Sequence, residues 1–319
     1  EGKGCNMKKS QFNVVNHSVR KTDAIGLATG KRTFTDDVSM KGMLSAGILR
    51  SPHAHARILE IDTSEAEKLP GVHCIVHHFN TPHVLHTTAG QGFPEPSPYD
   101  TLMFNRKVKF AGERVAAVAA ESEDIVREAL GKIKVTYEEL VPVLDAEEAL
   151  KEGIAVIHDE PDCHMPIPVP YEPGRNIAAR SEFTVGNIDK GLEEADHVFD
   201  ERYVAHYTSH CAIEPHAAVA WVDPDNRLII RCATQVPFHV RRIVASVLEI
   251  PVGRIRVIKP RIGGGFGGKQ EVFLEAVAGI LALRTGRPVR LVMSRAEVFT
   301  SARTRHPQIM RLRTGINND

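Results

Sequence analysis

The strongest chemical signal in the chain is a run of eight residues, Gly263 to Gln270, that reads Gly-Gly-Gly-Phe-Gly-Gly-Lys-Gln. The run follows a strand candidate at 254–259 and precedes an apolar-periodic segment at 272–283. A glycine loop between a strand and a helix often brings backbone N–H groups close to a phosphate or another anionic cofactor. Five glycines in six residues cost conformational entropy, so an ordinary tight turn is the less favoured interpretation. The run therefore predicts a loop whose backbone contacts a ligand.

Two known phosphate motifs nearly fit this loop. Gly263, Gly265 and Gly268 satisfy the dinucleotide pattern, but that pattern needs an acidic residue about 20 positions later, and Ser294-Arg295 follows the next strand candidate instead. The loop also resembles a phosphate-binding P-loop, whose eighth position must carry a Ser or Thr hydroxyl for magnesium. Here that position is Gln270. Both motifs remain as less favoured alternatives.

A second polar group lies at the end of a strand candidate at 228–234, where Gln235 precedes Pro237 and a helix candidate. A glutamine at a strand end that faces a cleft can donate its amide N–H to an oxo or carbonyl group. A capping role fits the local sequence equally well.

One further segment is a candidate metal site because it contains closely spaced ligand residues: His206, His210, Glu214 and His216. Two histidines at positions i and i+4 of a helix can chelate zinc. The surrounding residues favour a strand or irregular backbone, however, and Glu214-Pro215 breaks a helix. The favoured interpretation is a polar cluster that ties strands together around a nearby site. The segment 51–57, with two more histidines, is interpreted as a loop or an interface.

Composition excludes several classes of function. At 319 residues the chain suggests about two domains. Forty basic and forty acidic residues cancel, so no overall field attracts nucleic acid or a membrane. No apolar run is long enough to span a bilayer, and residues 1–16 lack the apolar core of a signal peptide. Five cysteines without C-x-x-C spacing argue against a disulfide framework and favour a reducing compartment, the cytoplasm.

The chain divides into four stretches: a polar lead-in at 1–20, a first block at 21–143, a proline-rich connector at 144–180 and a second block at 181–319. Strand candidates are 43–49, 57–61, 73–76, 114–119, 132–137, 197–207, 217–222, 228–234, 254–259, 288–293 and 309–314. Helix candidates are 63–69, 122–130, 188–194 and 238–248. Because strands and helices interleave, the fold class is α/β (α+β).

The two ends suggest a piece of a longer protein or one chain of a split assembly. Glu1 is not a start methionine, and the strand candidate 309–314 runs into the turn residues 317–319. We expect this last strand to lack a partner and to leave an edge that is prone to association.

Taken together, these segments resemble the molybdenum hydroxylase family of xanthine dehydrogenases, aldehyde oxidases and their bacterial relatives. The resemblance covers nearly the whole chain. It is carried by the segments 29–37, 49–58, 69–72, 110–116 and 137–140 in the first block and by 186–191, 213–216, 234–235 and 263–270 in the second. The resemblance implies a hammerhead-like α/β domain at 21–143, followed at 181–319 by the first part of an α+β molybdopterin-binding domain, apparently truncated.

The resemblance also implies roles for individual residues. Gln235 is similar to the family glutamine that hydrogen-bonds an oxo ligand of molybdenum. Gly264, Gly265, Phe266 and Gly267 are similar to the loop whose backbone lies against the molybdenum and its pterin. Gln270 stands where purine-oxidising members often carry a substrate-facing glutamate, so it is a candidate substrate contact and puts purine specificity in doubt. No protein residue is implied as a direct metal ligand.

The activity implied is hydroxylation of an electron-poor carbon in a purine, another N-heterocycle or an aldehyde, with water as the oxygen source. The cofactor is molybdenum-molybdopterin, with the cytosine dinucleotide form as one alternative. Electrons pass to [2Fe-2S] clusters, and these clusters and FAD are expected on other domains or subunits. The catalytic base and the rest of the pocket belong to a C-terminal half of the domain. We therefore expect an oligomer when complete and an inactive isolated chain. The alternative is a non-catalytic scaffold or assembly domain of the same fold without cofactor.

Overall fold

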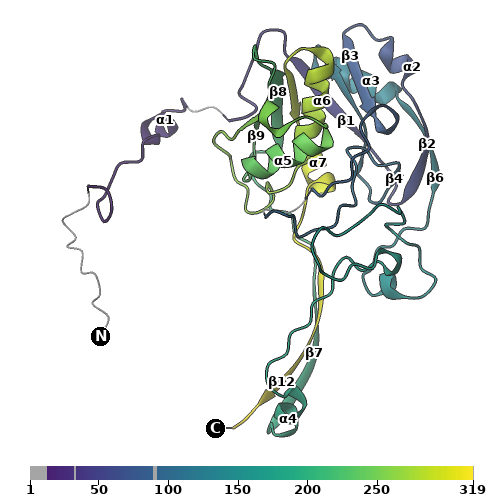
Figure 1. Cartoon of the computed structure of the whole chain (residues 1–319), viewed down its shortest axis with the longest axis vertical. Helices are drawn as coiled ribbons and strands as arrows, with labels where there is room; N and C mark the ends of the chain where they lie inside the picture. Colours follow the sequence, from purple (N-terminus) through teal and green to yellow (C-terminus); the bar gives the residue numbers. More distant parts are fainter. Residues whose placement is uncertain (1–12, 32–33, 89–91, 319) are drawn as a thin grey trace. The chain divides into compact units, whose positions relative to one another are not determined.

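The computed structural model describes residues 13–31, 34–88 and 92–318. The chain forms two units, Glu1–Thr33 and Phe34–Asp319. In the described part of the first unit, α1 (Ala24–Ala28) is a short helix without buried residues. The second unit contains the sheets and all the candidate site residues (Figure 1).

A seven-stranded sheet forms the centre of the second unit and takes strands from both predicted blocks. Its order is β10-β9-β8-β11-β1-β5-β3. The strands are β1 (Leu44–Arg50), β3 (Val72–His77), β5 (Arg114–Ala120), β8 (Ala217–Val222), β9 (Leu228–Cys232), β10 (Ile255–Ile258) and β11 (Val289–Val292). The blocks meet where β1 pairs in parallel with β11, with Leu44 opposite Val289. The two blocks therefore share one sheet, while the predicted boundaries at 143 and 181 stay a prediction.

A smaller layer packs against the β1–β5–β3 side of this sheet. The strands β2 (Ala56–Asp62), β4 (Lys107–Val108) and β6 (Lys134–Glu139) form a three-stranded sheet, with α2 (Ser64–Glu67) and α3 (Glu123–Lys132) beside it. Ser122 caps α3 by accepting a hydrogen bond from the backbone N–H of Ile125. Helix α3 packs closely on β1, because a Cβ at Gly47 would lie 2.6 Å from Val126 Cγ1.

Helices α5 (Pro237–Val247) and α6 (Glu275–Thr285) complete the main core. Helix α6 contacts α5 and the strands β3, β8, β9 and β11, and every residue from Glu275 to Ala282 is buried. A helix that is apolar all round belongs in an interior. The helix starts shortly after the glycine loop, so this core holds one end of the loop in place.

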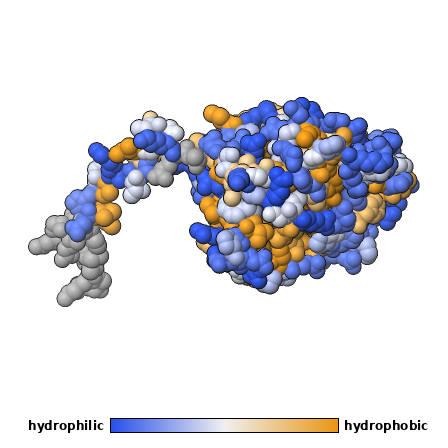
Figure 2. Space-filling model, turned by 90° about the horizontal axis from the view of Figure 1, so that it is seen from above, coloured by the Kyte–Doolittle hydropathy of each residue, from blue (hydrophilic) through white to orange (hydrophobic). Residues whose placement is uncertain are grey.

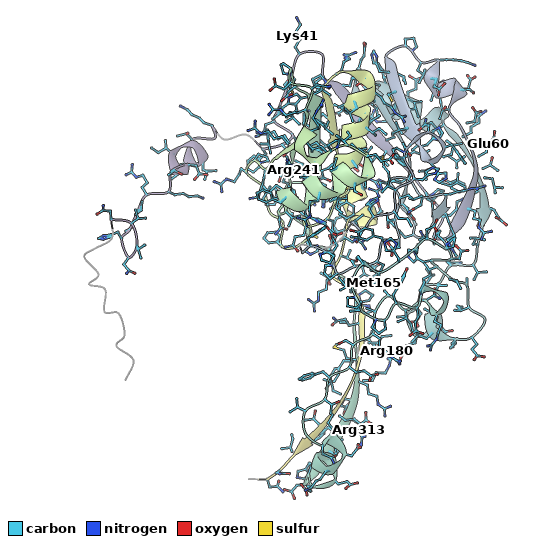
Figure 3. All side chains as sticks on the ribbon, in the orientation of Figure 1. Lys41, Glu60, Met165, Arg180, Arg241 and Arg313 are labelled. Atoms are coloured by element: carbon cyan, nitrogen blue, oxygen red, sulfur yellow. The ribbon has the colours of Figure 1, made fainter. Side chains whose placement is uncertain are left out.

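The last strand has a partner, which corrects the expectation of an unpaired edge at 309–314. Strand β12 (Gln308–Ile316) pairs antiparallel with β7 (His197–Ala205) over nine residue pairs. Arg311 strengthens the pair with two hydrogen bonds to Asp200, at 2.8 and 2.7 Å. The prediction was wrong because it assumed that the partner of this strand would follow it in a hairpin. The partner strand β7 instead lies more than a hundred residues earlier in the chain. Arg313 also lies on this two-stranded sheet (Figure 3).

The connector has little regular structure, as its prolines predict. Between 144 and 180 it holds only the single 3-10 turns η3 (Glu148–Leu150) and η4 (Pro173–Arg175). Helix α4 (Ile188–Glu193) follows it and is capped by Asn187. Three helices or strands were absent from the sequence interpretation: α1, the short strand β4, and α7 (Arg295–Ser301), which begins with a capping box of Ser294 and Glu297.

On the face shown in Figure 2, hydrophilic side chains surround smaller groups of hydrophobic ones. Across the described ranges, every helix is too short or too polar to cross a membrane.

The core around α6 gives a test of the packing. We expect Leu281→Ala, at a side chain that is 0% exposed, to lower the free energy of unfolding by about 2–5 kcal/mol, because it leaves a cavity. Leu283→Ala on the same helix, where the side chain is 37% exposed, serves as the control and should cost less than about 1 kcal/mol. Urea denaturation of both variants measures the difference, and equal losses would contradict the assigned orientation of α6.

Candidate functional site

Sheet order brings three parts of the candidate site to one edge. Strands β9 and β10 run parallel, so Gln235 after β9 and the glycine loop after β10 lie at the same end. Strand β8 runs antiparallel to β9, so His216, which directly precedes β8, also lies there. The site is therefore assembled by topology from segments far apart in the sequence.

Hydrogen bonds hold Gln235 against the glycine loop. Its backbone N–H donates to the Lys269 carbonyl at 2.8 Å. Its side-chain oxygen Oε1 accepts from the backbone N–H of Gly267 at 3.1 Å and of Lys269 at 3.3 Å. Only the oxygen of a carboxamide can accept these bonds, so the amide cannot flip without losing both. The Nε2 group is thereby left as a donor for a ligand.

The glycines of the loop are required partly by contacts within the protein. A Cβ at Gly265 would lie 2.5 Å from Gln235 Oε1, and one at Gly268 would lie 2.8 Å from His210 Nδ1. Gly267 is different, because its nearest neighbour would be 3.6 Å away while its φ of +96° disfavours any other residue. Phe266 also has a positive φ of 54° and its side chain is 74% exposed. The backbone thus turns sharply and presents Phe266 outward.

A buried ion pair fixes the loop from a second side. Lys269 Nζ lies 2.8 Å from Glu214 Oε2, and the two side chains are only 1% and 10% exposed. The same carboxylate oxygen accepts from the backbone N–H of Gly263 at 2.7 Å. Burial lowers the pKa of Lys269, and the hydrogen bond and charge of Glu214 oppose that shift. Lys269 therefore points into the protein, where it cannot serve as the phosphate-binding lysine of a P-loop.

The segment with several histidines supports the loop and does not form a helix. Residues 206–212 have no helical turn, so His206 and His210 are not spaced as a helical chelate. His216 Nε2 donates to the Gly268 carbonyl at 2.9 Å. Burial lowers the pKa of His216 to about 4, although this hydrogen bond favours the charged form. With Glu214 also bound to the loop, the structure agrees with a polar cluster that ties strands together beside a site.

The predicted loop at 51–57 is irregular backbone at 51–55 and passes into strand β2 at Ala56. The Ser51 hydroxyl and the backbone of His53 hydrogen-bond each other, and His55 Nδ1 contacts the Val141 carbonyl at 2.7 Å. His55 thus joins this segment to Val141, and the ring of His53 packs on Tyr137, so both histidines have structural contacts.

A cavity of about 420 Å³ opens beside the glycine loop. It is lined by Thr208, Ser209, His210, Phe266, Arg305, His306 and Gln308. Mutual backbone hydrogen bonds of Thr208 and Arg305 continue the β7–β12 pairing to its wall. An arginine and two histidines suit an anionic group. Gln235 and Gln270 are both half-buried, and neither lines this cavity. Gln235 lies against the glycine loop, whereas Gln270 is not brought to the cavity.

A larger cavity of about 760 Å³ lies between the first block and α7. Its lining includes Arg50, Asp100, Lys109, Arg114 and His158 together with Phe299 to Thr304, and no residue of the glycine loop.

Two family profiles match the chain. A family profile described as the molybdopterin cofactor-binding domain matches residues 170–319. A profile described as the α/β hammerhead domain of aldehyde oxidase and xanthine dehydrogenase matches residues 29–141. These matches and the mixed α/β architecture confirm the predicted fold class.

Individual relatives extend over almost the whole chain. A probable hypoxanthine oxidase of Escherichia coli O157:H7 is 38% identical over 334 residues, covering 98% of this chain and 35% of that protein. The nicotinate dehydrogenase large molybdopterin subunit of Eubacterium barkeri is 31% identical, covering 97% of this chain and 68% of the subunit. The crystal structure of quinoline 2-oxidoreductase from Pseudomonas putida 86 matches with a TM-score of 0.77 at 30% identity, covering 94% of this chain and 37% of that one.

Fold and site together define a molybdopterin-binding chain. The chain belongs to the molybdenum hydroxylase family of xanthine dehydrogenases and aldehyde oxidases. It spans 35% of the length of the hypoxanthine oxidase that it matches.

Sequence reasoning missed two features of the site. It did not pair Lys269 with Glu214, although Ile213-Glu214-Pro215-His216 was noted as a family segment. It also missed α7, whose Arg295 donates to the carbonyls of Ala212 and Ile213 at 2.8 Å each and so holds the segment that carries Glu214. The capping box at Ser294 was the available signal for that helix.

The buried His216 predicts a pH dependence of stability. Its pKa falls from an ordinary 6.5 to about 4 on folding, so below pH 6.5 the unfolded chain binds more protons than the folded chain. This contribution to stability is complete above pH 6.5 and is lost as the pH falls toward 4. We expect His216→Gln, which can still donate to Gly268, to make the stability loss over this range shallower. Urea denaturation between pH 7 and 4.5 measures it, and identical slopes for both proteins would contradict the assignment.

Proposed function

We propose that this chain supplies the cofactor-facing wall of a molybdenum hydroxylase. The observation that carries the proposal is the fixed amide of Gln235, whose oxygen is held by the backbone N–H groups of Gly267 and Lys269. This arrangement leaves a preorganised N–H donor next to a loop in which Gly264, Phe266 and Gly267 have positive φ. Donors fixed in advance stabilise developing charge without reorganisation.

The residues present fit molybdenum-molybdopterin. Gln235 would donate to an oxygen on the metal, and the backbone of Gly264 to Gly267 would lie against the pterin. The cavity with Arg305 and His306 suits the phosphate end of the group, and the cytosine dinucleotide form is one alternative there. When bound, the group supplies the redox chemistry for hydroxylating an electron-poor carbon with oxygen from water.

The proposed activity requires further domains or subunits. We infer that a C-terminal half of the domain completes the pocket and provides the catalytic base, and that [2Fe-2S] and FAD reside on other domains or subunits. The isolated chain would then be inactive, because half a pocket leaves the cofactor in water, where each donor is worth little. Cys74, Cys163, Cys211 and Cys232 are all free thiols, which supports a cytoplasmic location for the assembly.

For the substrate, we propose an N-heterocycle in preference to an aldehyde. Three of the relatives carry names that refer to hypoxanthine, nicotinate and quinoline, all of them N-heterocycles. Gln270 is uncharged and half-buried, and it makes no hydrogen bond to the described residues, so it is free to turn toward a substrate in the completed pocket. A neutral amide there argues against a role as an acid or base.

Substitution of Gln235 tests the proposal. In the completed enzyme, we expect Gln235→Ala to lower turnover by about 10²–10³-fold, the usual cost of losing one preorganised donor. Molybdenum content should fall far less, because many backbone contacts hold the pterin. Steady-state kinetics and elemental analysis of the same preparation give both numbers. Parallel loss of metal and activity would show that Gln235 only anchors the cofactor, and a completed assembly that never contains molybdenum would favour the scaffold alternative.

The loop backbone gives an independent prediction. We expect Gly267→Val to abolish cofactor loading, because a β-branched residue is strained at a φ of +96° and would distort the backbone that faces the pterin. Gly253→Val is the matched control, since a Cβ there meets nothing within 4 Å. Molybdenum per protein after purification is the measurement, and normal loading of Gly267→Val would mean that the loop is only a turn.

A further inference from the structure

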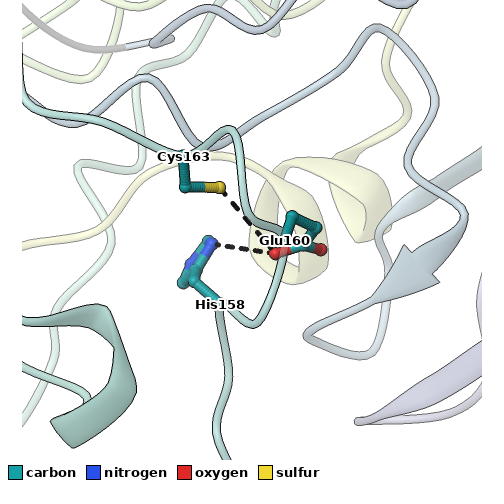
Figure 4. Close-up of side chains that lie close together, drawn as sticks. All are labelled: His158, Glu160 and Cys163. Carbon is teal, nitrogen blue, oxygen red and sulfur yellow. Dashed lines mark hydrogen bonds and ion pairs between the residues drawn. The ribbon is translucent and has the colours of Figure 1, made fainter.

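The connector carries a cluster of donor atoms outside the molybdopterin site. His158, Glu160 and Cys163 each place a ligand atom so that all three lie within 4.8 Å of one another (Figure 4). Glu160 Oε2 lies at the centre, 3.9 Å from His158 Nδ1 and 3.9 Å from Cys163 Sγ. Imidazole nitrogen, carboxylate oxygen and thiolate sulfur are the ligand atoms that zinc uses in proteins, so Cys163 would bind a metal after its thiol proton has left to solvent.

A rigid turn holds two of these side chains together. The backbone N–H of Cys163 donates to the Glu160 carbonyl at 3.2 Å, and the turn residues between them are Pro161 and Asp162. Proline at the second position of a β-turn fixes its φ in advance. Glu160 and Cys163 therefore face each other without further loss of backbone freedom.

The imidazole of His158 has the environment of a metal ligand. Its Nδ1, which faces Glu160, is buried and makes no hydrogen bond in the part of the chain that the structure describes. Its Nε2, on the opposite side of the ring, lies 3.7 Å from Asp100 Oδ2. Metal-bound histidines commonly donate their second N–H to a carboxylate, which fixes the ring and its tautomer. Asp100 is placed for that role.

Two lysines partly neutralise the negative charge of Glu160, and both contact the carboxylate oxygen that faces away from His158 and Cys163. Lys109 Nζ lies 3.1 Å from Glu160 Oε1, and Lys107 Nζ lies 3.9 Å from the same oxygen. The other carboxylate oxygen, Oε2, is the one that faces His158 and Cys163. His158, Asp100 and Lys109 also line the cavity of about 760 Å³, which gives an ion a route to the cluster.

We propose that His158 Nδ1, Glu160 Oε2 and Cys163 Sγ form a zinc site, with a water molecule as the fourth ligand and Asp100 as the partner of His158. Tetrahedral zinc with bonds of about 2.0–2.3 Å needs donor atoms about 3.3–3.8 Å apart. Two of the observed separations are 3.9 Å and the third, between His158 and Cys163, is at most 4.8 Å, so side-chain rotations are needed to bring all three into this range. All three ligands lie in the connector, and the contact of His158 with Asp100 links the site to the first block, where Tyr99 pairs with His164 through a backbone hydrogen bond of 2.8 Å.

Cobalt and zinc binding to the purified 319-residue chain, kept reduced, test the proposal. Co²⁺ should give a thiolate-to-metal charge-transfer band at one equivalent, and Zn²⁺ should displace it and raise the melting temperature. Asp100→Asn should weaken Zn²⁺ binding by about 10- to 100-fold, as is typical when a group that orients a metal ligand is changed. Cys163→Ser removes a ligand itself, so it should abolish the band and weaken Zn²⁺ binding by more than that.

Matched controls separate this site from adventitious binding. Cys74→Ser removes another half-buried thiol, and His164→Gln removes the exposed histidine next to Cys163. Both should bind Zn²⁺ like the wild type. Circular dichroism without metal tests whether the Cys163→Ser variant is folded. If that variant is unfolded, Glu160→Gln takes its place in the binding measurements. Absence of the charge-transfer band in the wild type, or wild-type Zn²⁺ affinity in the Cys163 and Glu160 variants, would overturn the proposal.

Discussion

The structure of the candidate site depends on how closely the glycine loop approaches its neighbours. Gln235, Glu214 and His216 each hydrogen-bond the loop backbone, at distances of 2.7 to 3.3 Å. Side chains on Gly263 or Gly265 would prevent this approach, because a Cβ there would lie 2.6 Å from Glu214 Cβ or 2.5 Å from Gln235 Oε1. The glycines therefore let Gln235 and Glu214 hydrogen-bond the loop backbone at close range, and in the proposed function the opposite side of the backbone faces the cofactor. A loop held in this way is preorganised, which is what electrostatic stabilisation requires.

Sheet topology explains why these residues meet. The parallel pair β9–β10 and the antiparallel pair β8–β9 bring three chain segments to one edge. The buried helix α6 holds the C-terminal side of the loop, and Arg295 of α7 holds the segment of Glu214. The buried pair of Lys269 and Glu214 is a costly way to join two segments, because both charges lose water. It persists here with a further hydrogen bond from Gly263, so it fixes the position of the loop.

Much of this architecture could be predicted from the sequence. Alternating or apolar strands and most helices were predicted within a few residues, and residue type and spacing made the glycine loop, Gln235 and the segment around Glu214 candidates for the site. Long-range partners could not be predicted. The β7–β12 pairing, the Lys269–Glu214 ion pair and the sharing of one sheet by both blocks depend on contacts between distant segments, which local periodicity does not encode. The role of Lys269 shows this limit, since its place in a P-loop-like run suggests a phosphate contact while its side chain is buried inward.

In the proposed function, Gln235 presents its amide N–H to the cofactor while its oxygen stays bound to the loop. A crystal structure of the completed protein with molybdenum-molybdopterin bound tests this claim directly. We predict that the cofactor lies against the backbone of Gly265 to Gly267, with Gln235 Nε2 donating to an oxygen on the metal and Oε1 still accepting from Gly267. A cofactor bound elsewhere, or a Gln235 side chain turned away from it, would contradict the account.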